Sequence, residues 1–153
     1  MSITQAHHTG YTVADIDRSI TFYRDVLGFE LIMQQEKSGG YLGEIVGYPD
    51  ARVKMAHMRP PHGDHILELF QYLSPESRPA RHEPKDIGTA HVCYLVSDLD
   101  GLYRRLREAG IDGFHSPPVE VDTGVNKGGK ALYLRDPDGL LVELFQRATP
   151  AAS

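Results

Sequence analysis

The sequence has no tryptophan, a single cysteine and no long apolar run. Because Cys93 has no second cysteine to pair with, an intrachain disulfide is excluded and a cytoplasmic location is expected. No stretch approaches the ~20 apolar residues of a membrane span, and the polar N-terminus lacks the layout of a signal peptide, so no membrane partner is expected. Basic residues are also few, since 16 Lys and Arg stand against 21 Asp and Glu. This balance argues against nucleic acid as the main partner.

The composition that remains is that of an ordinary globular protein, with 41% hydrophobic and 24% charged residues. A chain of 153 residues is long enough for one compact domain or for two small modules. Eight histidines are a mild enrichment, which directs the search toward metal-ligating side chains.

One four-residue string, Glu-Leu-Phe-Gln, stands at positions 68–71 and again at 143–146. Both copies lie within apolar runs that are typical of strands. Alternate side chains of a strand share a face, so Glu68 and Glu143 should each lie in the middle of an apolar face. Burying a lone carboxylate is costly. Each glutamate must therefore be protonated, paired with a cationic group or bound to a metal.

The segments before the two strings also align, and they share a histidine, an Asp-x-Asp motif and a closing glycine. The matched positions are His8 with His91, Asp15 with Asp98, Asp17 with Asp100, and Gly28 with Gly110. The aspartates are candidate helix N-caps, and the glycines suit the left-handed end of a helix. The chain therefore reads as two copies of one module.

Each module is expected to fold as βαβββ, which makes the fold class α+β. The first module should span 1–74, a proline-containing linker 75–88, and the second module 89–153. Apolar runs typical of strands lie at 6–13, 29–35, 40–46, 52–58 and 65–72, and then at 89–96, 114–121, 130–135 and 140–147.

The first strand of each module thus offers a histidine and the last strand a glutamate. If the modules pair symmetrically, His8, Glu68, His91 and Glu143 would converge on one cleft. Two neutral imidazoles and two carboxylates balance the charge of a divalent cation, and mixed N and O ligands suit Zn, Ni, Co, Fe or Mn. The alternative interpretation is two capped histidines and two glutamates at a solvated edge.

The order βαβββ twice, with HxxxxVxDxD, a glycine-closed helix and DPDG before the final glutamate, resembles the vicinal oxygen chelate superfamily. This superfamily includes glyoxalase I, methylmalonyl-CoA epimerase, extradiol dioxygenases and antibiotic-resistance proteins. The resemblance covers about residues 5–147. It implies a curved mixed sheet around a metal cleft, a small-molecule substrate and a homodimer.

Carried over residue by residue, the resemblance implies the metal ligands His8, Glu68, His91 and Glu143, a set most similar to that of glyoxalase I. Two positions depart from glyoxalase I. Thr12 and Tyr72 stand where that family has the Arg and Asn that contact glutathione. These differences count against glutathione as part of the substrate but leave the expected metal chemistry unchanged.

The implied activity is that of a metal-dependent lyase or isomerase, which moves a proton next to a carbonyl through a metal-stabilised enediolate. Glu143 is the expected base and Glu68 its symmetry partner. Three further residues, besides Thr12 and Tyr72, are candidates for contact with the substrate: Tyr133, Lys130 and His57. Lys130 lies beside a glycine-rich loop, and His57 shares strand parity with Met55.

Two other functions fit the same resemblance. An extradiol dioxygenase would need Fe(II) and O2, and its usual set of two histidines and one glutamate differs from the one implied here. A non-enzymatic protein that binds an antibiotic or metabolite would need no metal and a cleft lined by aromatic residues. The absence of tryptophan gives that function little support.

Overall fold

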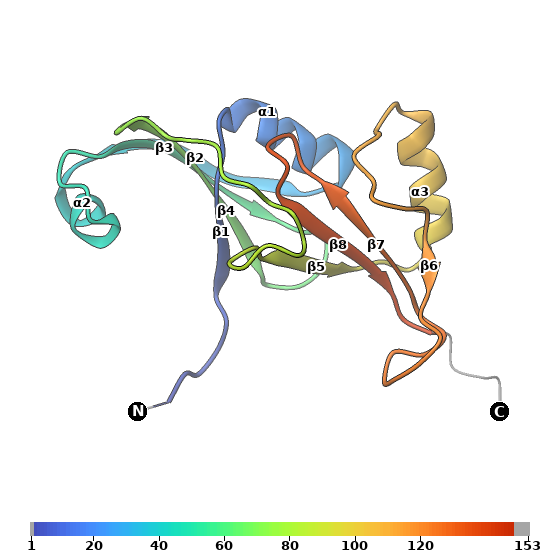
Figure 1. The fold of residues 1–153 in the computed structure, drawn as a ribbon. Coiled ribbons are helices and arrows are strands. Elements are labelled where there is room, and N and C mark those ends of the chain that lie inside the picture. The colour runs from blue at the N-terminus through green and yellow to red at the C-terminus, as the bar shows by residue number, and fades with distance from the viewer. Residues whose placement is uncertain (1, 149–153) are drawn as a thin grey trace. The chain divides into compact units, whose positions relative to one another are not determined.

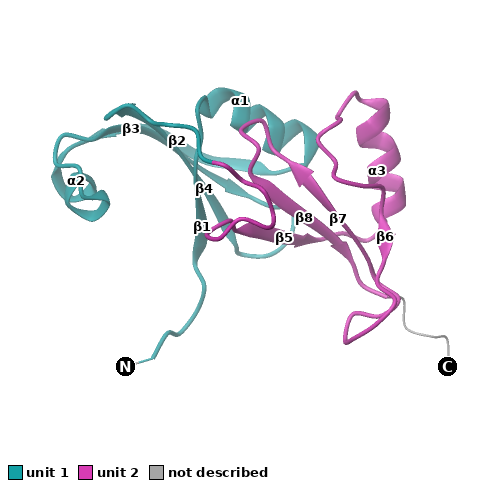
Figure 2. Ribbon diagram, viewed as in Figure 1, with its two compact units in different colours: residues 1–80 teal, residues 81–153 magenta. Residues whose placement is uncertain are grey.

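The structure is a computed structural model that describes residues 2–148. The chain divides into two compact units, Met1–Ala80 (unit 1) and Arg81–Ser153 (unit 2), shown in Figure 2. The border between them falls inside the segment expected to link the two modules. Each unit contains one four-stranded mixed sheet with helices (Figure 1), so the expected α+β class is confirmed.

Unit 1 contains the strands of the first sheet in the order β1-β4-β3-β2. Its elements are β1 (His8–Thr12), α1 (Ile16–Thr21) continued by the π-helical turn η1 (Phe22–Val26), β2 (Glu30–Ser38), α2 (Gly40–Val46), β3 (Arg52–Arg59) and β4 (Ile66–Ser74). Strand β1 is parallel to β4, and the other neighbours are antiparallel.

Unit 2 repeats this arrangement, with the strand order β5-β8-β7-β6. Its elements are β5 (His91–Leu95), α3 (Leu99–Glu108), β6 (Val119–Glu120), β7 (Lys130–Arg135) and β8 (Leu141–Gln146). The first and last strands are again parallel neighbours. The expected duplication is thus present in the topology as well as in the sequence.

The Asp-x-Asp motifs start the helices as predicted. The Asp15 carboxylate accepts hydrogen bonds from the backbone N–H groups of Asp17 and Arg18, and the Asp98 carboxylate accepts one from Gly101 at 2.8 Å. These bonds satisfy N–H groups that have no partner within a helix. After the helices, Gly28 and Gly110 adopt φ values of 76° and 81°, as expected for left-handed turns.

The glutamine of each repeated string is a second helix cap. The Gln71 side-chain oxygen accepts a hydrogen bond from the Ile16 amide at 3.1 Å, and the Gln146 oxygen accepts one from the Leu99 amide at 2.7 Å. The last strand of each unit therefore holds the first turn of the helix that covers its sheet.

Alternation along β4 and β8 separates the core from the opposite face of each sheet. Leu67 and Leu69 are fully buried, and in unit 2 Val142 is fully buried and Leu144 nearly so. In unit 1 this face lies against α1, which contacts β3 and β4. The glutamate between each pair of buried residues therefore points to the face away from the helix.

Two of the expected strands are wrong or shortened. Residues 40–46 form the helix α2 at the end of the sheet, between β2 and β3 (Figure 1). Gly39 and Gly40 adopt positive φ values that break the extended backbone, and Gly47 closes the helix in the left-handed conformation. Within 114–121 only β6 is a strand, because the two prolines before Val119 have no N–H to donate.

Among the described residues, no helix combines the length and the apolarity that crossing a membrane requires.

Candidate functional site

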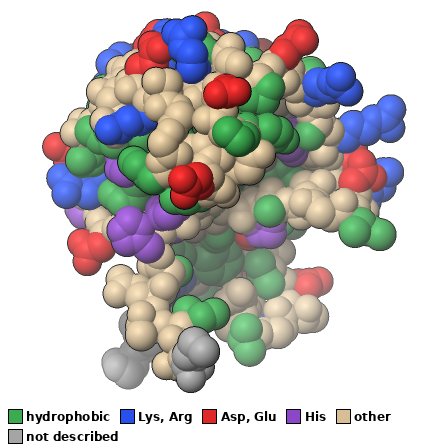
Figure 3. Space-filling view, turned by 90° about the vertical axis from the view of Figure 1, so that its left-hand side faces the viewer, with side chains coloured by type: hydrophobic (Ala, Val, Ile, Leu, Met, Phe, Trp, Pro, Cys, Tyr) green, Lys and Arg blue, Asp and Glu red, His purple; other side chains and the backbone are tan. Residues whose placement is uncertain are grey.

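In unit 1, His8 and Glu68 meet on the sheet face away from α1. They come from the parallel neighbours β1 and β4, and the His8 Nε2 atom lies 3.5 Å from the Glu68 Oε2 atom. The Glu68 side chain is only 14% exposed, whereas that of His8 is 45% exposed. Several histidine side chains are visible at the surface in Figure 3. The pair thus combines a largely buried carboxylate with an imidazole that a ligand can reach.

His57 is the second imidazole beside Glu68. It stands directly opposite Glu68 in the antiparallel register of β3 and β4, and its Nε2 atom lies 2.7 Å from Glu68 Oε1. The two oxygens of one carboxylate therefore face two different histidines. The parity of β3 predicted the correct face for His57, but its contact with Glu68 depends on a cross-strand register that the sequence did not reveal.

Unit 2 brings His91 and Glu143 together in the equivalent way. The His91 Nε2 atom lies 3.0 Å from Glu143 Oε2, and the Glu143 side chain is 23% exposed. Tyr133 stands opposite Glu143 in the register of β7 and β8. Its ring packs edge-on against His91 with centroids 5.1 Å apart, and the His115 ring also meets it edge to face, with centroids 6.0 Å apart. Partial burial and the charge of Glu143 raise the pKa of the Tyr133 phenol.

Cys93 is a further neighbour of Glu143 that the sequence did not single out. It is the register partner of Glu143 across β5 and β8, where unit 1 has Gly10 opposite Glu68. Partial burial of the thiol, the charge of Glu143 and a hydrogen bond with it raise the pKa of Cys93 to about 11. The available signal was strand parity, because Cys93 follows His91 by two residues.

The remaining predicted residues divide between the two sheet faces. In unit 1, Thr12 pairs with Phe70 in register, and Tyr72 follows Phe70 by two residues, so both belong to the face of Glu68. In unit 2, Lys130 belongs to the opposite face from Glu143. Its ammonium group pairs with Asp100 of α3, so the structure does not bring Lys130 together with Glu143.

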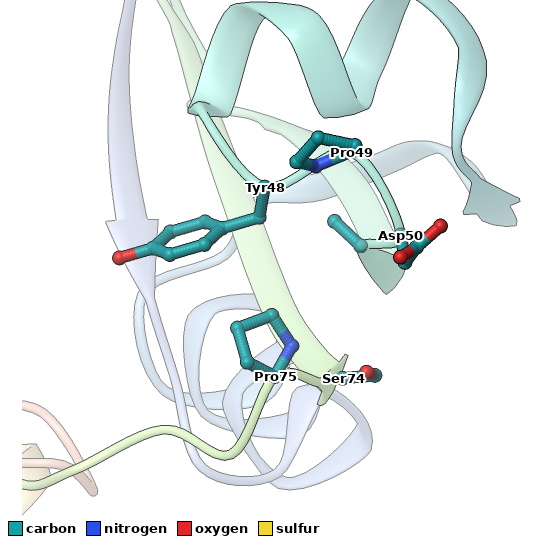
Figure 4. Close-up of a pocket in the computed structure, with 6 residues that line it drawn as sticks. Tyr48, Pro49, Asp50, Ser74 and Pro75 are labelled. Atoms are coloured by element: carbon teal, nitrogen blue, oxygen red, sulfur yellow. The ribbon is translucent and has the colours of Figure 1, made fainter.

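A shallow pocket of about 200 Å³ lies near Tyr72 in unit 1 (Figure 4). It is formed by the turn after α2 and the end of β4, and its lining residues are Tyr48, Pro49, Asp50, Ala51, Ser74 and Pro75. The Tyr48 and Tyr72 rings meet edge to face with centroids 6.4 Å apart. Burial, with Tyr48 as the lesser cause, raises the pKa of the Tyr72 phenol.

The spacing within each His–Glu pair fits ligands of one cation. Two ligand atoms that each lie about 2.1 Å from a metal are about 3.0 Å apart at a right angle and about 3.4 Å apart at the tetrahedral angle. The observed separations are 3.5 Å in unit 1 and 3.0 Å in unit 2. Within residues 2–148, however, no group of three or more His, Cys, Asp or Glu side chains is already arranged as a complete metal site.

Comparison with known proteins identifies one matching family model and several related proteins. Residues 5–144 match the family model described as Glyoxalase/Bleomycin resistance protein/Dioxygenase superfamily. A 2-epi-5-epi-valiolone epimerase from an Actinomyces species is 30% identical over 145 residues, which cover 91% of this chain and 77% of the relative. A lactoylglutathione lyase from Salmonella typhimurium is 29% identical over 144 residues, or 91% of this chain and 90% of the lyase.

Solved structures agree on the fold. A glyoxalase family protein from Bacillus cereus superimposes with a TM-score of 0.80 at 24% identity, over 97% of each chain. At that identity the likeness supports the fold alone.

Proposed function

The chain belongs to the Glyoxalase/Bleomycin resistance protein/Dioxygenase superfamily, and from this premise we propose that it is a metal-dependent lyase or isomerase. The reaction would move a proton at a carbon next to a carbonyl group of a small oxygenated substrate. The observation that carries the proposal is the repeated pair of a histidine and a largely buried glutamate, with separations of 3.5 and 3.0 Å.

His8 with Glu68, and His91 with Glu143, would hold the cation, which is one of Zn, Ni, Co, Fe or Mn. When bound, such a cation supplies a Lewis acid that polarises the carbonyl oxygen of the substrate. The donor atoms support this assignment, since neutral imidazole nitrogen and carboxylate oxygen are ordinary ligands of these metals.

Glu143 is the proposed base. A carboxylate can accept the proton from the carbon next to the carbonyl and return it to the same or the neighbouring carbon. The Glu143 side chain is 23% exposed against 14% for Glu68, so it is the more accessible of the two acids. Both named relatives, an epimerase and a lyase, fit proton transfer of this kind.

The proposed substrate class is a small oxygenated carbonyl compound that is not a glutathione adduct. Thr12 and Tyr72 provide no positive charge on the face of Glu68. We propose that the edge-to-face pair of Tyr48 and Tyr72 contacts an uncharged part of the substrate. The homodimer and the cytoplasmic location expected from the sequence stay predictions.

Deuterium exchange tests the proposal without knowledge of the natural substrate. The purified protein is stripped with a chelator, reloaded with each metal in turn, and incubated in D2O with 2-hydroxycyclohexanone as the probe. We expect metal-dependent deuterium exchange at the carbon beside the carbonyl, measured by NMR. The rate of exchange should fall by about 10²–10⁴-fold in Glu143→Gln. Elemental analysis should find metal in the wild type and less in Glu68→Ala and Glu143→Ala.

Two results would contradict the proposal. Full exchange after complete removal of metal would exclude a metal-dependent reaction. Consumption of O2 with a catechol by the Fe(II)-loaded protein, without exchange of the ketone, would favour the dioxygenase instead.

A further inference from the structure

The two glutamates occupy equivalent places in the two units, but their cross-strand neighbours differ. His57 stands opposite Glu68, whereas Tyr133 stands opposite Glu143. His57 is 2.7 Å from Glu68, a full hydrogen bond between side chains that are only 27% and 14% exposed. The duplication therefore gives one acid an imidazole partner on the adjacent antiparallel strand and gives the other a phenol ring.

The direction of this bond depends on the tautomer of His57. An ionised carboxylate can only accept hydrogen bonds, so the His57 Nε2 atom carries the proton and donates it to Glu68 Oε1. A bond to a charged, partly buried acceptor is among the stronger ones in proteins. Because Oε1 is engaged in this way, the remaining oxygen, Oε2, is the one that faces His8 at 3.5 Å.

We propose that His57 is a positioning residue, which holds Glu68 so that Oε2 stays turned toward His8. This inference rests on the proposed function, because it makes Glu68 an oriented ligand for the cation. Carboxylate ligands of metals are commonly held by such hydrogen bonds, and loss of the partner typically weakens metal binding by about 10–100-fold. Glu68 is thereby suited to be a fixed metal ligand, and Glu143 remains the proposed base.

The test measures metal affinity rather than turnover. Isothermal titration calorimetry with Ni²⁺ compares the full-length wild type with His57→Leu, which has no donor, and with His57→Gln, whose amide can donate to Glu68. We expect His57→Leu to bind Ni²⁺ about 10–100-fold more weakly and His57→Gln to recover most of that loss. The matched control is His65→Leu, which removes a histidine that directly precedes β4 and is bonded to Thr9 of β1 at 3.1 Å.

The outcomes separate this inference from the proposed function. Absence of Ni²⁺ binding by the wild type would overturn the proposed function. Binding by the wild type and by His57→Leu with equal affinity would overturn only the role of His57. An equal loss in His57→Leu and His57→Gln would also overturn it, because it would make His57 a metal ligand itself.

A second measurement does not depend on metal or on the stability of any His57 variant. Nitrogen-15 NMR of the metal-free wild type should show the His57 Nε2 atom protonated, and Glu68→Gln should change that signal. An Nε2 atom without a proton at neutral pH would overturn the inference.

Discussion

The Cys93 thiol reports on the surroundings of Glu143, and it is the only thiol in the chain. Partial burial, the charge of Glu143 and the hydrogen bond with it raise the pKa of this thiol from the ordinary 9.0 to about 11. At neutral pH a rise of this size reduces the thiolate population by about 100-fold. The thiolate that remains is about 10-fold more nucleophilic, because nucleophilicity increases with pKa. The net reaction rate should therefore be about 10-fold below that of the unfolded chain.

The assay is the reaction of Cys93 with a chromogenic aromatic disulfide across about pH 7 to 11. The residue is exposed overall, so the reagent has access. In the folded wild type the rate should still rise above pH 9, where the rate for the urea-unfolded chain levels off. In Glu143→Gln the pKa should fall part of the way toward 9.0, since burial is the largest cause and remains.

Glu68→Gln is the matched control, because it is the same substitution at the equivalent position of unit 1. It should leave the pH profile of Cys93 unchanged. An inflection at or below pH 9 in the folded wild type, or identical profiles for the wild type and Glu143→Gln, would refute the contact between the thiol and the carboxylate.

Two further predictions concern the start of α3. Gln146→Leu removes the acceptor for the Leu99 amide, so the free energy of unfolding in urea should fall by about 1–3 kcal/mol. An unchanged midpoint of urea unfolding would contradict the role of Gln146 as a helix cap. Gly101→Ala places a Cβ atom in a clash with the Asp98 Oδ2 atom and should displace the cap, at a cost of about 0.5–2 kcal/mol. Combined with Asp98→Ala it should cost little more than Asp98→Ala alone, whereas additive losses would exclude displacement of the cap as the cause.

The sequence predicted the features of the fold that depend on local chemistry. Asp15 and Asp98 cap helices because a short side-chain oxygen beside free N–H groups does so in almost any context. Gly28 and Gly110 end them because few other residues tolerate a positive φ. Pairing of the duplicated His and Glu followed from strand alternation together with the repeat.

Features that depend on the register of neighbouring strands, or on whether a segment forms a helix or a strand, were not predicted. The segment at 40–46 has apolar residues that suit a strand, and only the backbone of its flanking glycines makes it a helix. The contacts of His57 with Glu68 and of Cys93 with Glu143 require knowing which residues stand opposite each other in neighbouring strands. Strand alternation assigns a side chain to one face of the sheet, but it does not say which residues of two neighbouring strands are paired.

The capping role of Gln71 and Gln146 was also missed, although the repeat displayed it. Burial of a lone carboxylate is costly and marks the glutamate in the sequence, whereas a glutamine has no charge that would mark it in the same way. The glutamine bonds to a helix 55 residues earlier in unit 1 and 47 residues earlier in unit 2, and only the folded chain reveals such a distant partner.

The repeated Glu-Leu-Phe-Gln string has a consequence for how the two halves of the chain were free to diverge. Strand alternation assigns its leucine to the core and its glutamine to the helix cap, while its glutamate lies on the other face. Substitutions around the glutamate can therefore accumulate without disturbing the scaffold. The two copies differ in this way: Gly10 and Cys93 occupy equivalent places beside the acids, while the leucine and the glutamine of the string are the same in both. The duplicated half-site therefore has two different chemical environments, each supported by the same core leucine and capping glutamine.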